Sequence, residues 1–129
     1  MKNHHMLAAM AVLFIALGVT ESTAAQEQQP QQAVKATPTE YEGWRQYMVT
    51  CARCHGDDGV AGIMAPDLRH AVTAGGLDSA AFHDVVINGR LPQGMPSLRD
   101  VLDEHQIADI YAYLIARATK GLPAGRPDH

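Results

Sequence analysis

The clearest pattern of apolar and polar positions lies near the C-terminal end of the chain. Asp103 can act as an N-cap with Gln106 three residues later, and Gly121 provides a stop. Arg117 and Lys120 stand in the last turn, where cations complement the helix dipole. The apolar residues between these signals share one helix face: Ile107, Ile110, Tyr111, Leu114, Ile115 and Ala118. The pattern therefore predicts a helix from about Asp103 to Gly121.

A second amphipathic helix is predicted to begin at Thr39. Thr39 and Glu42 have the spacing of a capping box. The apolar face of this helix is expected to carry Tyr41, Trp44, Met48 and Cys51. Gly43 in its interior costs about 1 kcal/mol relative to alanine. A gap of this kind often lets a neighbouring helix approach closely.

Between these two helices the chain is rich in loops. A short helix capped by Asp78 or Ser79 is expected to end at Asn88-Gly89, with Phe82, Val85 and Val86 on one face. Residues 63–76 show no strong periodicity, and residues 90–97 hold two prolines and a glycine, which exclude a helix or a central strand. No segment predicts a strand convincingly. We expect an all-α domain of three or more helices whose long loops wrap around something.

The N-terminal residues are expected to lie outside the domain. Residues 1–25 have the layout of a secretory signal peptide, with an apolar run from Met6 to Val19 and cleavage near Ala24 or Ala25. The run is shorter than the roughly 20 residues needed to span a bilayer, so we expect a periplasmic protein without stable membrane insertion. The Gln/Pro-rich residues 26–38 predict a disordered lead-in, 39–121 the folded domain, and 122–129 a C-terminal tail.

Composition and charge narrow the possible functions. Ten Lys and Arg against 14 Asp and Glu give a net charge of −4, which argues against nucleic acid as a partner. A domain this small usually needs a covalent staple, a metal or a cofactor. The only cysteines are Cys51 and Cys54, and a bridge between them would close too small a loop to help much. Something else must fill the core.

The stretch Cys51-Ala-Arg-Cys54-His55 admits three interpretations. A thiol oxidoreductase would place the pair at the start of a helix in a βαβ unit, whereas here a helix precedes Cys51. A zinc site needs further ligands, and the other histidines are not paired at a suitable spacing. Covalent haem attachment uses both thiols for thioether bonds and His55 as an iron ligand. This third interpretation also explains the small core and the long loops.

The second axial ligand is expected to be Met95. Gly94 and Pro96 flank it, and they permit close backbone approach to a flat cofactor and a rigid loop. Met64 is the rival, but it follows His55 closely in the sequence. His70, His83 or His105 would give bis-His ligation instead, although each is expected to be a surface or helix-face histidine. His/Met ligation predicts a single-electron carrier and not an enzyme. If Met95 is not a ligand, an open haem acting as a peroxidase or small-gas sensor is the alternative.

The chain resembles the class I c-type cytochromes over residues 39–121. The segments that carry the resemblance are Cys51-Ala-Arg-Cys54-His55, Ala65-Pro66-Asp67-Leu68, Gly94-Met95-Pro96 and the region around Ile110 to Leu114. The resemblance implies a cytochrome c fold around one covalent haem c. It also implies that the Pro66 carbonyl accepts a hydrogen bond from the His55 ring. In this family the first and last helices cross at a small residue and an aromatic, roles that match Gly43 and Tyr111, with Tyr47 or Trp44 beside them.

A finer resemblance concerns the redox partners. Asn88-Gly89-Arg90 and Gly125-Arg126-Pro127 are similar to segments of cytochromes that accept electrons from periplasmic PQQ-dependent alcohol dehydrogenases. This implies an electron-donating dehydrogenase and an electron-accepting oxidase or cytochrome, with a general respiratory shuttle as the competing assignment. The acidic balance favours a partner with a basic or mixed docking surface. Arg69 and Arg90 are expected either to neutralise haem propionates or to be solvated surface arginines.

Overall fold

The computed structural model describes residues 33–129, so the predicted signal peptide and residues 26–32 of the predicted lead-in lie outside the described residues. Five α-helices follow one another: α1 (Pro38–Thr50), α2 (Ala52–His55), α3 (Leu68–Thr73), α4 (Ser79–Asn88) and α5 (Glu104–Thr119). Two 3₁₀ turns, η1 (Asp57–Gly59) and η2 (Leu91–Gln93), stand in the loops. Across residues 33–129 the only β pairing is an isolated bridge, which confirms the all-α prediction. None of the helices in this range has the length and apolar character to cross a membrane.

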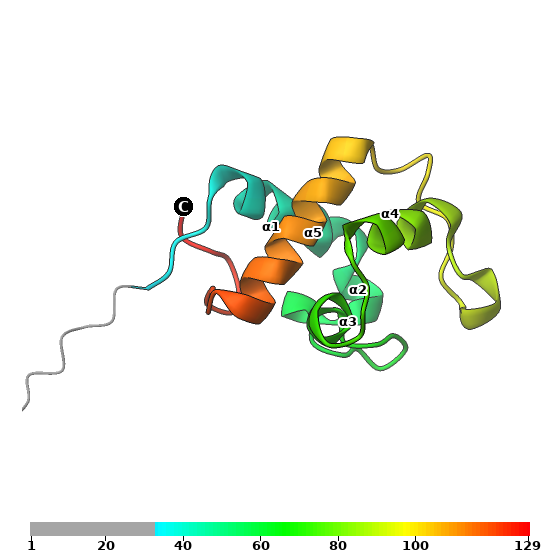
Figure 1. Ribbon diagram of the computed structural model, residues 1–129, viewed down its shortest axis with the longest axis horizontal. Coiled ribbons are helices and arrows are strands. Elements are labelled where there is room, and N and C mark those ends of the chain that lie inside the picture. The colour runs from blue at the N-terminus through cyan, green and yellow to red at the C-terminus, as the bar shows by residue number, and fades with distance from the viewer. Residues whose placement is uncertain (1–32) are drawn as a thin grey trace, which may run out of the picture. The chain divides into compact units, whose positions relative to one another are not determined.

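Helices α1 and α5 cross each other, as Figure 1 shows. Gly43 of α1 lies where the two helices meet. A Cβ atom at Gly43 would lie 1.9 Å from the carbonyl oxygen of Asp109 and 2.9 Å from Cβ of Tyr113. The predicted close approach is thus present. The aromatic residue at the crossing is Tyr113, whose ring centroid lies 5.5 Å from that of Tyr47. The expectation of Tyr111 was wrong, because Tyr111 packs on Phe82 of α4 at 5.5 Å between centroids.

Helix α1 begins two residues earlier than the sequence pattern predicted. Thr37 is the N-cap, and its hydroxyl and the Glu40 carboxylate complete the capping box. Two overlapping pairs in the sequence have this spacing, and Pro38 selects the first because proline favours the first helical position. The buried face of α1 carries Glu40, Gly43 and Tyr47, whereas the predicted face member Met48 is exposed.

Helix α5 is the central element of the core. Its capping box of Asp103 and Gln106 is present as predicted, and Gly121 follows it with a φ of 70°. The buried side chains of α5 lie on more than one face of the helix: Ile107, Ile110, Tyr113, Leu114, Ala116 and Arg117. Burial on several sides follows because α1, α3 and α4 all pack against this helix.

A short helix, α3, occupies the segment in which the sequence showed no periodicity. The Asp67 side chain caps it by accepting a hydrogen bond from the His70 backbone N–H at 2.9 Å. Only Leu68 and Val72 of α3 are buried. A helix of 6 residues with two core residues is too short to give a periodic pattern.

Residues 122–129 pack against the domain, although the sequence predicted a tail. Leu122 and Pro127 are buried, and the backbone N–H of Ala36 donates to the Asp128 carbonyl at 2.7 Å. Arg126 donates to the Tyr41 hydroxyl at 2.7 Å. The C-terminal residues therefore run beside the start of α1, and Ala36, which falls in the predicted lead-in, is itself buried.

Candidate cofactor site

An apolar cavity of about 370 Å³ lies among α2, α3, α4 and the loop that follows α4. Cys51, Cys54 and His55 line it, and so does Met95 from a distant part of the sequence. The remaining lining is largely aliphatic and aromatic, and includes Leu68, Phe82, Val86 and Leu98. The structure thus brings the cysteine–histidine segment and the predicted methionine to one cavity.

The cysteine segment is a continuation of the first helix. Cys51 ends α1 and its backbone N–H donates to the Tyr47 carbonyl at 2.8 Å. The hydroxyl of Tyr47 donates in turn to the Gly56 carbonyl at 2.6 Å, which fixes the chain just after His55. Both cysteines are free thiols. Burial raises the pKa of Cys51 above its ordinary value, so this thiol is protonated at neutral pH.

The ring of His55 is buried and held by a backbone acceptor. Its Nδ1 lies 3.0 Å from the carbonyl oxygen of Pro66. A carbonyl can only accept, so Nδ1 carries the proton and Nε2 keeps its lone pair. This is the contact that the family resemblance implied. Gly62 makes the intervening loop compact, because a Cβ there would lie 2.0 Å from the Cys54 carbonyl oxygen.

The loop that carries Met95 is closed on itself by backbone hydrogen bonds to Arg90, which follows α4. Arg90 N–H donates to the Met95 carbonyl at 2.8 Å, and Met95 N–H donates to the Arg90 carbonyl at 3.2 Å. Gly94 has a left-handed φ of 85°, which glycine adopts without strain. Gly89 lies beneath the loop, where a Cβ would come within 2.9 Å of the Met95 carbonyl oxygen. These backbone contacts therefore fix the position of Met95.

Of the other candidate residues from the sequence, some line the cavity and some do not. Arg90 and Met64 line the cavity, and Pro66 does so beside its contact with His55. Arg69 is not a lining residue, and its side chain runs beside Gly59 instead. The sequence reasoning did not identify Thr50, Leu68 or Leu98 as lining residues. Each is an isolated apolar or small residue in a loop or at a helix end, where no hydrophobic periodicity indicates that it lines the cavity.

A polar cluster centred on Asp58 lies just after the cysteine segment. Asp58 adopts a left-handed φ of 62° and accepts hydrogen bonds from the Tyr113 hydroxyl at 3.2 Å and the Gly125 N–H at 3.0 Å. Its carboxylate also lies 3.5 Å from Nε of Arg117, which is buried and donates to the Leu122 carbonyl. Burial, with the nearby Asp58 charge, raises the pKa of Tyr113 above its ordinary range, so this hydroxyl stays a donor.

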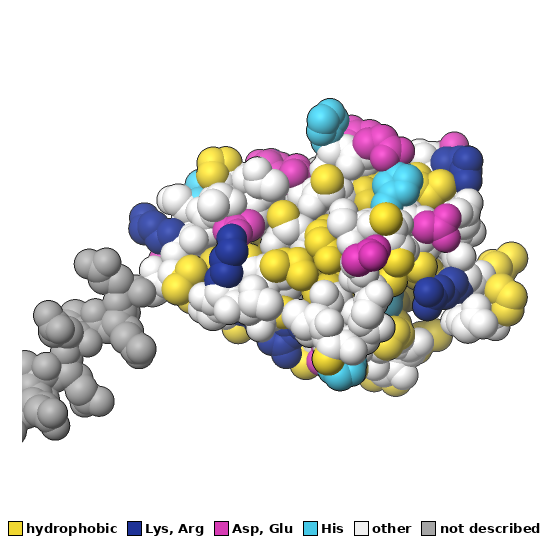
Figure 2. All heavy atoms as spheres, viewed as in Figure 1, with side chains coloured by type: hydrophobic (Ala, Val, Ile, Leu, Met, Phe, Trp, Pro, Cys, Tyr) yellow, Lys and Arg dark blue, Asp and Glu magenta, His cyan; other side chains and the backbone are white. Residues whose placement is uncertain are grey.

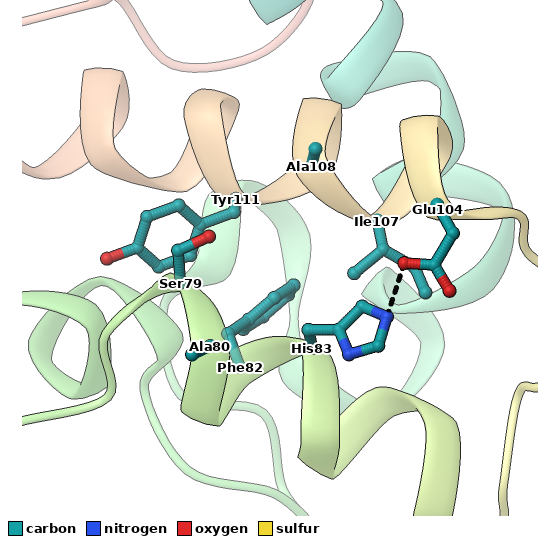
Figure 3. Close-up of a pocket in the computed structure, with 8 residues that line it drawn as sticks. All are labelled: Ser79, Ala80, Phe82, His83, Glu104, Ile107, Ala108 and Tyr111. Atoms are coloured by element: carbon teal, nitrogen blue, oxygen red, sulfur yellow. Dashed lines mark ion pairs between the residues drawn. The ribbon is translucent and has the colours of Figure 1, made fainter.

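A second hollow, of about 390 Å³, opens between α4 and α5 (Figure 3). Phe82 and Tyr111 form its apolar wall, and Nε2 of His83 lies 2.6 Å from a carboxylate oxygen of Glu104 across it. No thiol or thioether lines it, so its donor groups differ from those of the first cavity.

The donor set of the first cavity fits a covalent haem. It combines two free thiols, an imidazole whose Nε2 is left available, and a thioether, within largely apolar walls. Thioether attachment and imidazole and thioether ligation of iron need these groups. A structural zinc site is less well matched. Among residues 33–129 no group of three or more His, Cys, Asp or Glu side chains is placed to hold a metal ion.

Comparison with known proteins agrees with this donor set. Residues 38–114 match the family model described as cytochrome C oxidase, cbb3-type, subunit III. The chain is 39% identical over 92 residues to cytochrome c-553I of Paracoccus denitrificans, which covers 67% of this chain and 41% of that protein. It is 34% identical over 86 residues to quinohemoprotein alcohol dehydrogenase ADH-IIG of Pseudomonas putida, which covers 67% of this chain and 11% of that enzyme.

Two solved structures are also similar to this chain in fold. The c-type cytochrome XoxG from Methylobacterium extorquens AM1 superposes with a TM-score of 0.60 at 29% identity, over 70% of this chain and 57% of that chain. ADHIIG from Pseudomonas putida HK5 superposes with a TM-score of 0.55 at 30% identity, over 70% of this chain and 14% of that chain. The chain therefore spans less than two thirds of the length of each of these relatives.

Proposed function

Because the chain belongs to the cytochrome c family, whose members carry haem c, we propose that it is a periplasmic one-electron carrier with His/Met ligation. In this role it accepts electrons from a dehydrogenase of the PQQ-dependent alcohol dehydrogenase type and passes them to a respiratory chain. It is a carrier and not an enzyme in its own right.

The observation that carries the proposal is the meeting of four side chains in one apolar cavity. Cys51 and Cys54 would hold the haem by thioether bonds, and His55 would ligate the iron through Nε2 because its Nδ1 is engaged by the Pro66 carbonyl. Met95, on a loop fixed by its own backbone hydrogen bonds, would supply the second ligand. Arg90, a cation at the cavity wall, would neutralise a haem propionate.

When bound, the haem supplies an iron that takes up and gives up a single electron. The chain's own residues keep the site suited to this and to no other reaction. With His55 and Met95 both committed to the iron, no position would be open to oxygen or peroxide. With the haem in place, the largely apolar walls would limit the access of water to the iron. One electron would enter from the donor and one would leave to the acceptor, with no substrate bond made or broken.

The dehydrogenase partner is supported by the relatives. The cytochrome part of a quinohemoprotein alcohol dehydrogenase matches this chain over most of the described domain, within a much longer enzyme. A domain of the same fold would suit an electron carrier that serves an enzyme of this type. The predicted signal peptide supports the periplasmic location, which is also where thioether attachment to haem requires the thiols to be delivered.

An absorption spectrum of the exported protein, made with a haem-attachment system, tests the proposal. We expect a c-type spectrum on reduction, haem that stays on the protein through acid-organic extraction, and the weak far-red band of sulfur bound to ferric iron. The double variant Cys51→Ala, Cys54→Ala should lose the haem on extraction. If the haem is covalent but the far-red band is missing, the sixth position of the iron is held by a histidine or is open. No haem at all would contradict the proposal.

A further inference from the structure

Residues 97–99, named here the strap, begin two positions after Met95. In Figure 1 the loop that follows α4 runs outward and then returns to the C-terminal end of this helix. The last carbonyl groups of a helix have no partner within the helix. The strap supplies a partner for one of them, because the Leu98 N–H donates to the Val86 carbonyl at 2.9 Å. The two backbones are in close contact, since a Cβ atom at Gly89 would come within 2.6 Å of the first backbone nitrogen of the strap.

The side chain of Ser97 makes a second link between the strap and α4. Its hydroxyl donates to the Ile87 carbonyl, and the same oxygen accepts a hydrogen bond from the Arg99 N–H at 3.4 Å. The first bond satisfies another carbonyl at the end of the helix, and the second closes the strap on itself. An alanine side chain in place of Ser97 could make neither contact.

The side-chain amide of Asn88 makes a third link. Its Nδ2 donates to the carboxylate of Asp84, one turn earlier in α4, at 2.6 Å, and its Oδ1 accepts from the Arg99 guanidinium at 2.8 Å. A carboxylate can only accept and a guanidinium can only donate, so the two partners fix the amide in one orientation. These residues are exposed, and Figure 2 shows acidic and basic side chains on this face over α4 and the loop after it. Substitution of Asn88 or Ser97 therefore removes hydrogen bonds without opening a cavity in the core.

We propose that Ser97 and Asn88 are positioning residues for Met95: by holding the strap on the end of α4, they limit how often Met95 leaves the haem iron. The inference rests on the His/Met ligation of the proposed function. A ligand on a loop can dissociate only when the loop moves away, and the strap opposes this movement because opening it would break its hydrogen bonds to the helix end. Met95 lines the cavity and neither Ser97 nor Asn88 does, so these two residues act through the backbone of the loop.

Displacement of Met95 by added imidazole measures how often the loop opens. The ferric, haem-loaded protein is mixed with increasing concentrations of imidazole, and the loss of the far-red band is followed. One iron–sulfur bond breaks and one iron–nitrogen bond forms, with no change of oxidation state, and at high imidazole the rate reaches a limit set by loop opening. We expect Ser97→Ala and Asn88→Ala each to raise this limiting rate by roughly three- to tenfold, the effect of a lost hydrogen bond. Ser97→Thr, which keeps the hydroxyl group, should restore the wild-type rate.

Matched controls remove comparable hydrogen bonds elsewhere on the surface. Thr119→Ala removes an exposed hydroxyl that donates to a carbonyl of α5 at 2.8 Å, and Glu42→Ala removes the carboxylate that binds Arg45 on α1. Neither control should change the limiting rate. Amide hydrogen exchange of the haem-loaded protein then shows whether the opening is local. Ser97→Ala should speed exchange at the Leu98 N–H and leave the amides of α5 unchanged.

The outcomes separate this inference from the proposed function. Limiting rates that match the wild type in both alanine variants, or that rise equally in Thr119→Ala, would overturn the role of Ser97 and Asn88 while leaving His/Met ligation intact. Faster exchange throughout α5 in Ser97→Ala would also overturn it, because Ser97 would then stabilise the whole domain and not position Met95 in particular. A wild-type protein that binds haem but lacks the far-red band would contradict ligation by Met95 in the proposed function and, with it, this inference.

Discussion

The carboxylate of Asp58 and the guanidinium of Arg117 lie 3.5 Å apart, with both side chains largely buried. Asp58 stands three residues after His55, and Arg117 stands in the last turn of α5. Asp58 also binds the N–H of Gly125, and Arg117 binds the carbonyl of Leu122. The pair therefore joins three separate parts of the chain: the loop after the cysteines, the C-terminal helix and the C-terminal residues.

Asp58→Asn should destabilise the folded protein by roughly 2–4 kcal/mol, because it leaves the buried Arg117 without its charge partner. Asparagine tolerates the left-handed backbone of this position, so the change isolates the charge. Urea unfolding measures the loss. Asp57→Asn, at the exposed neighbouring residue, is the control and should change the stability by less than about 0.5 kcal/mol. Equal effects of the two variants would contradict a specific role for the Asp58–Arg117 pair.

Gly43→Ala should destabilise the protein by roughly 1–3 kcal/mol despite the better helix propensity of alanine. The added methyl group would lie 1.9 Å from a backbone oxygen of α5, and neither backbone can move without separating the two helices. Thermal unfolding of the haem-loaded protein measures the effect. Thr39→Ala, at an exposed position of the same helix, should leave the melting temperature nearly unchanged. A stabilised Gly43→Ala variant would show that α1 and α5 do not pack this closely.

Local sequence signals predicted the elements whose causes are themselves local. The capping box of Asp103 and Gln106, the stop at Gly121 and the cap at Asp78 all involve residues within one helical turn, and all are present. The start of α1 was misplaced by two residues because two capping boxes overlap and only Pro38 distinguishes them. Such errors are expected where neighbouring residues offer equivalent caps.

Features that depend on distant parts of the chain could not be predicted in this way. The aromatic residue at the helix crossing is Tyr113, because the rotation of α5 is set by α1, α3 and α4 together. The burial of Leu122 and Pro127 depends on contacts with Asp58 and with the residues before α1.

Glu40→Gln should reduce stability at neutral pH by up to about 1 kcal/mol, since it removes a charged partner of the half-exposed Lys120. Burial alone would raise the pKa of Glu40, but hydrogen bonds from Lys120 and Thr37 outweigh it and hold the pKa below its ordinary value of 4.5. A lowered folded-state pKa means that the carboxylate stabilises the protein fully above 4.5 and loses this contribution as the pH falls through the lower value.

The difference between wild type and Glu40→Gln should therefore be constant at neutral pH and shrink on acidification below pH 4.5. Urea unfolding at a series of pH values measures it. Glutamine still accepts the hydrogen bond from the Thr37 N–H, so the capping box is kept and only the charge is lost. A difference that grows toward low pH would contradict the assignment.

Met95→Ala should remove the far-red absorption band of the ferric protein and lower the reduction potential by roughly a tenth of a volt or more. The reason is that Met95 would be the thioether ligand, and thioether ligation favours the reduced iron. A spectroscopic redox titration measures both effects. Met64→Ala is the matched control, since Met64 lines the same cavity with the same chemistry but is 85% exposed on the loop after His55.

The Met64→Ala and Met95→Ala variants together distinguish the possible ligands of the iron. If Met64→Ala removes the band and Met95→Ala does not, the ligand lies on the His55 side of the sequence and the loop at Met95 has a purely structural role. If the far-red band is absent from the wild type and neither variant changes the spectrum, neither Met64 nor Met95 binds the iron, and the haem would be open or bound by a second histidine. Peroxide would then be expected to react with the ferric protein, because an open position can bind it. Loss of the band in Met95→Ala alone would support a closed site built for electron transfer.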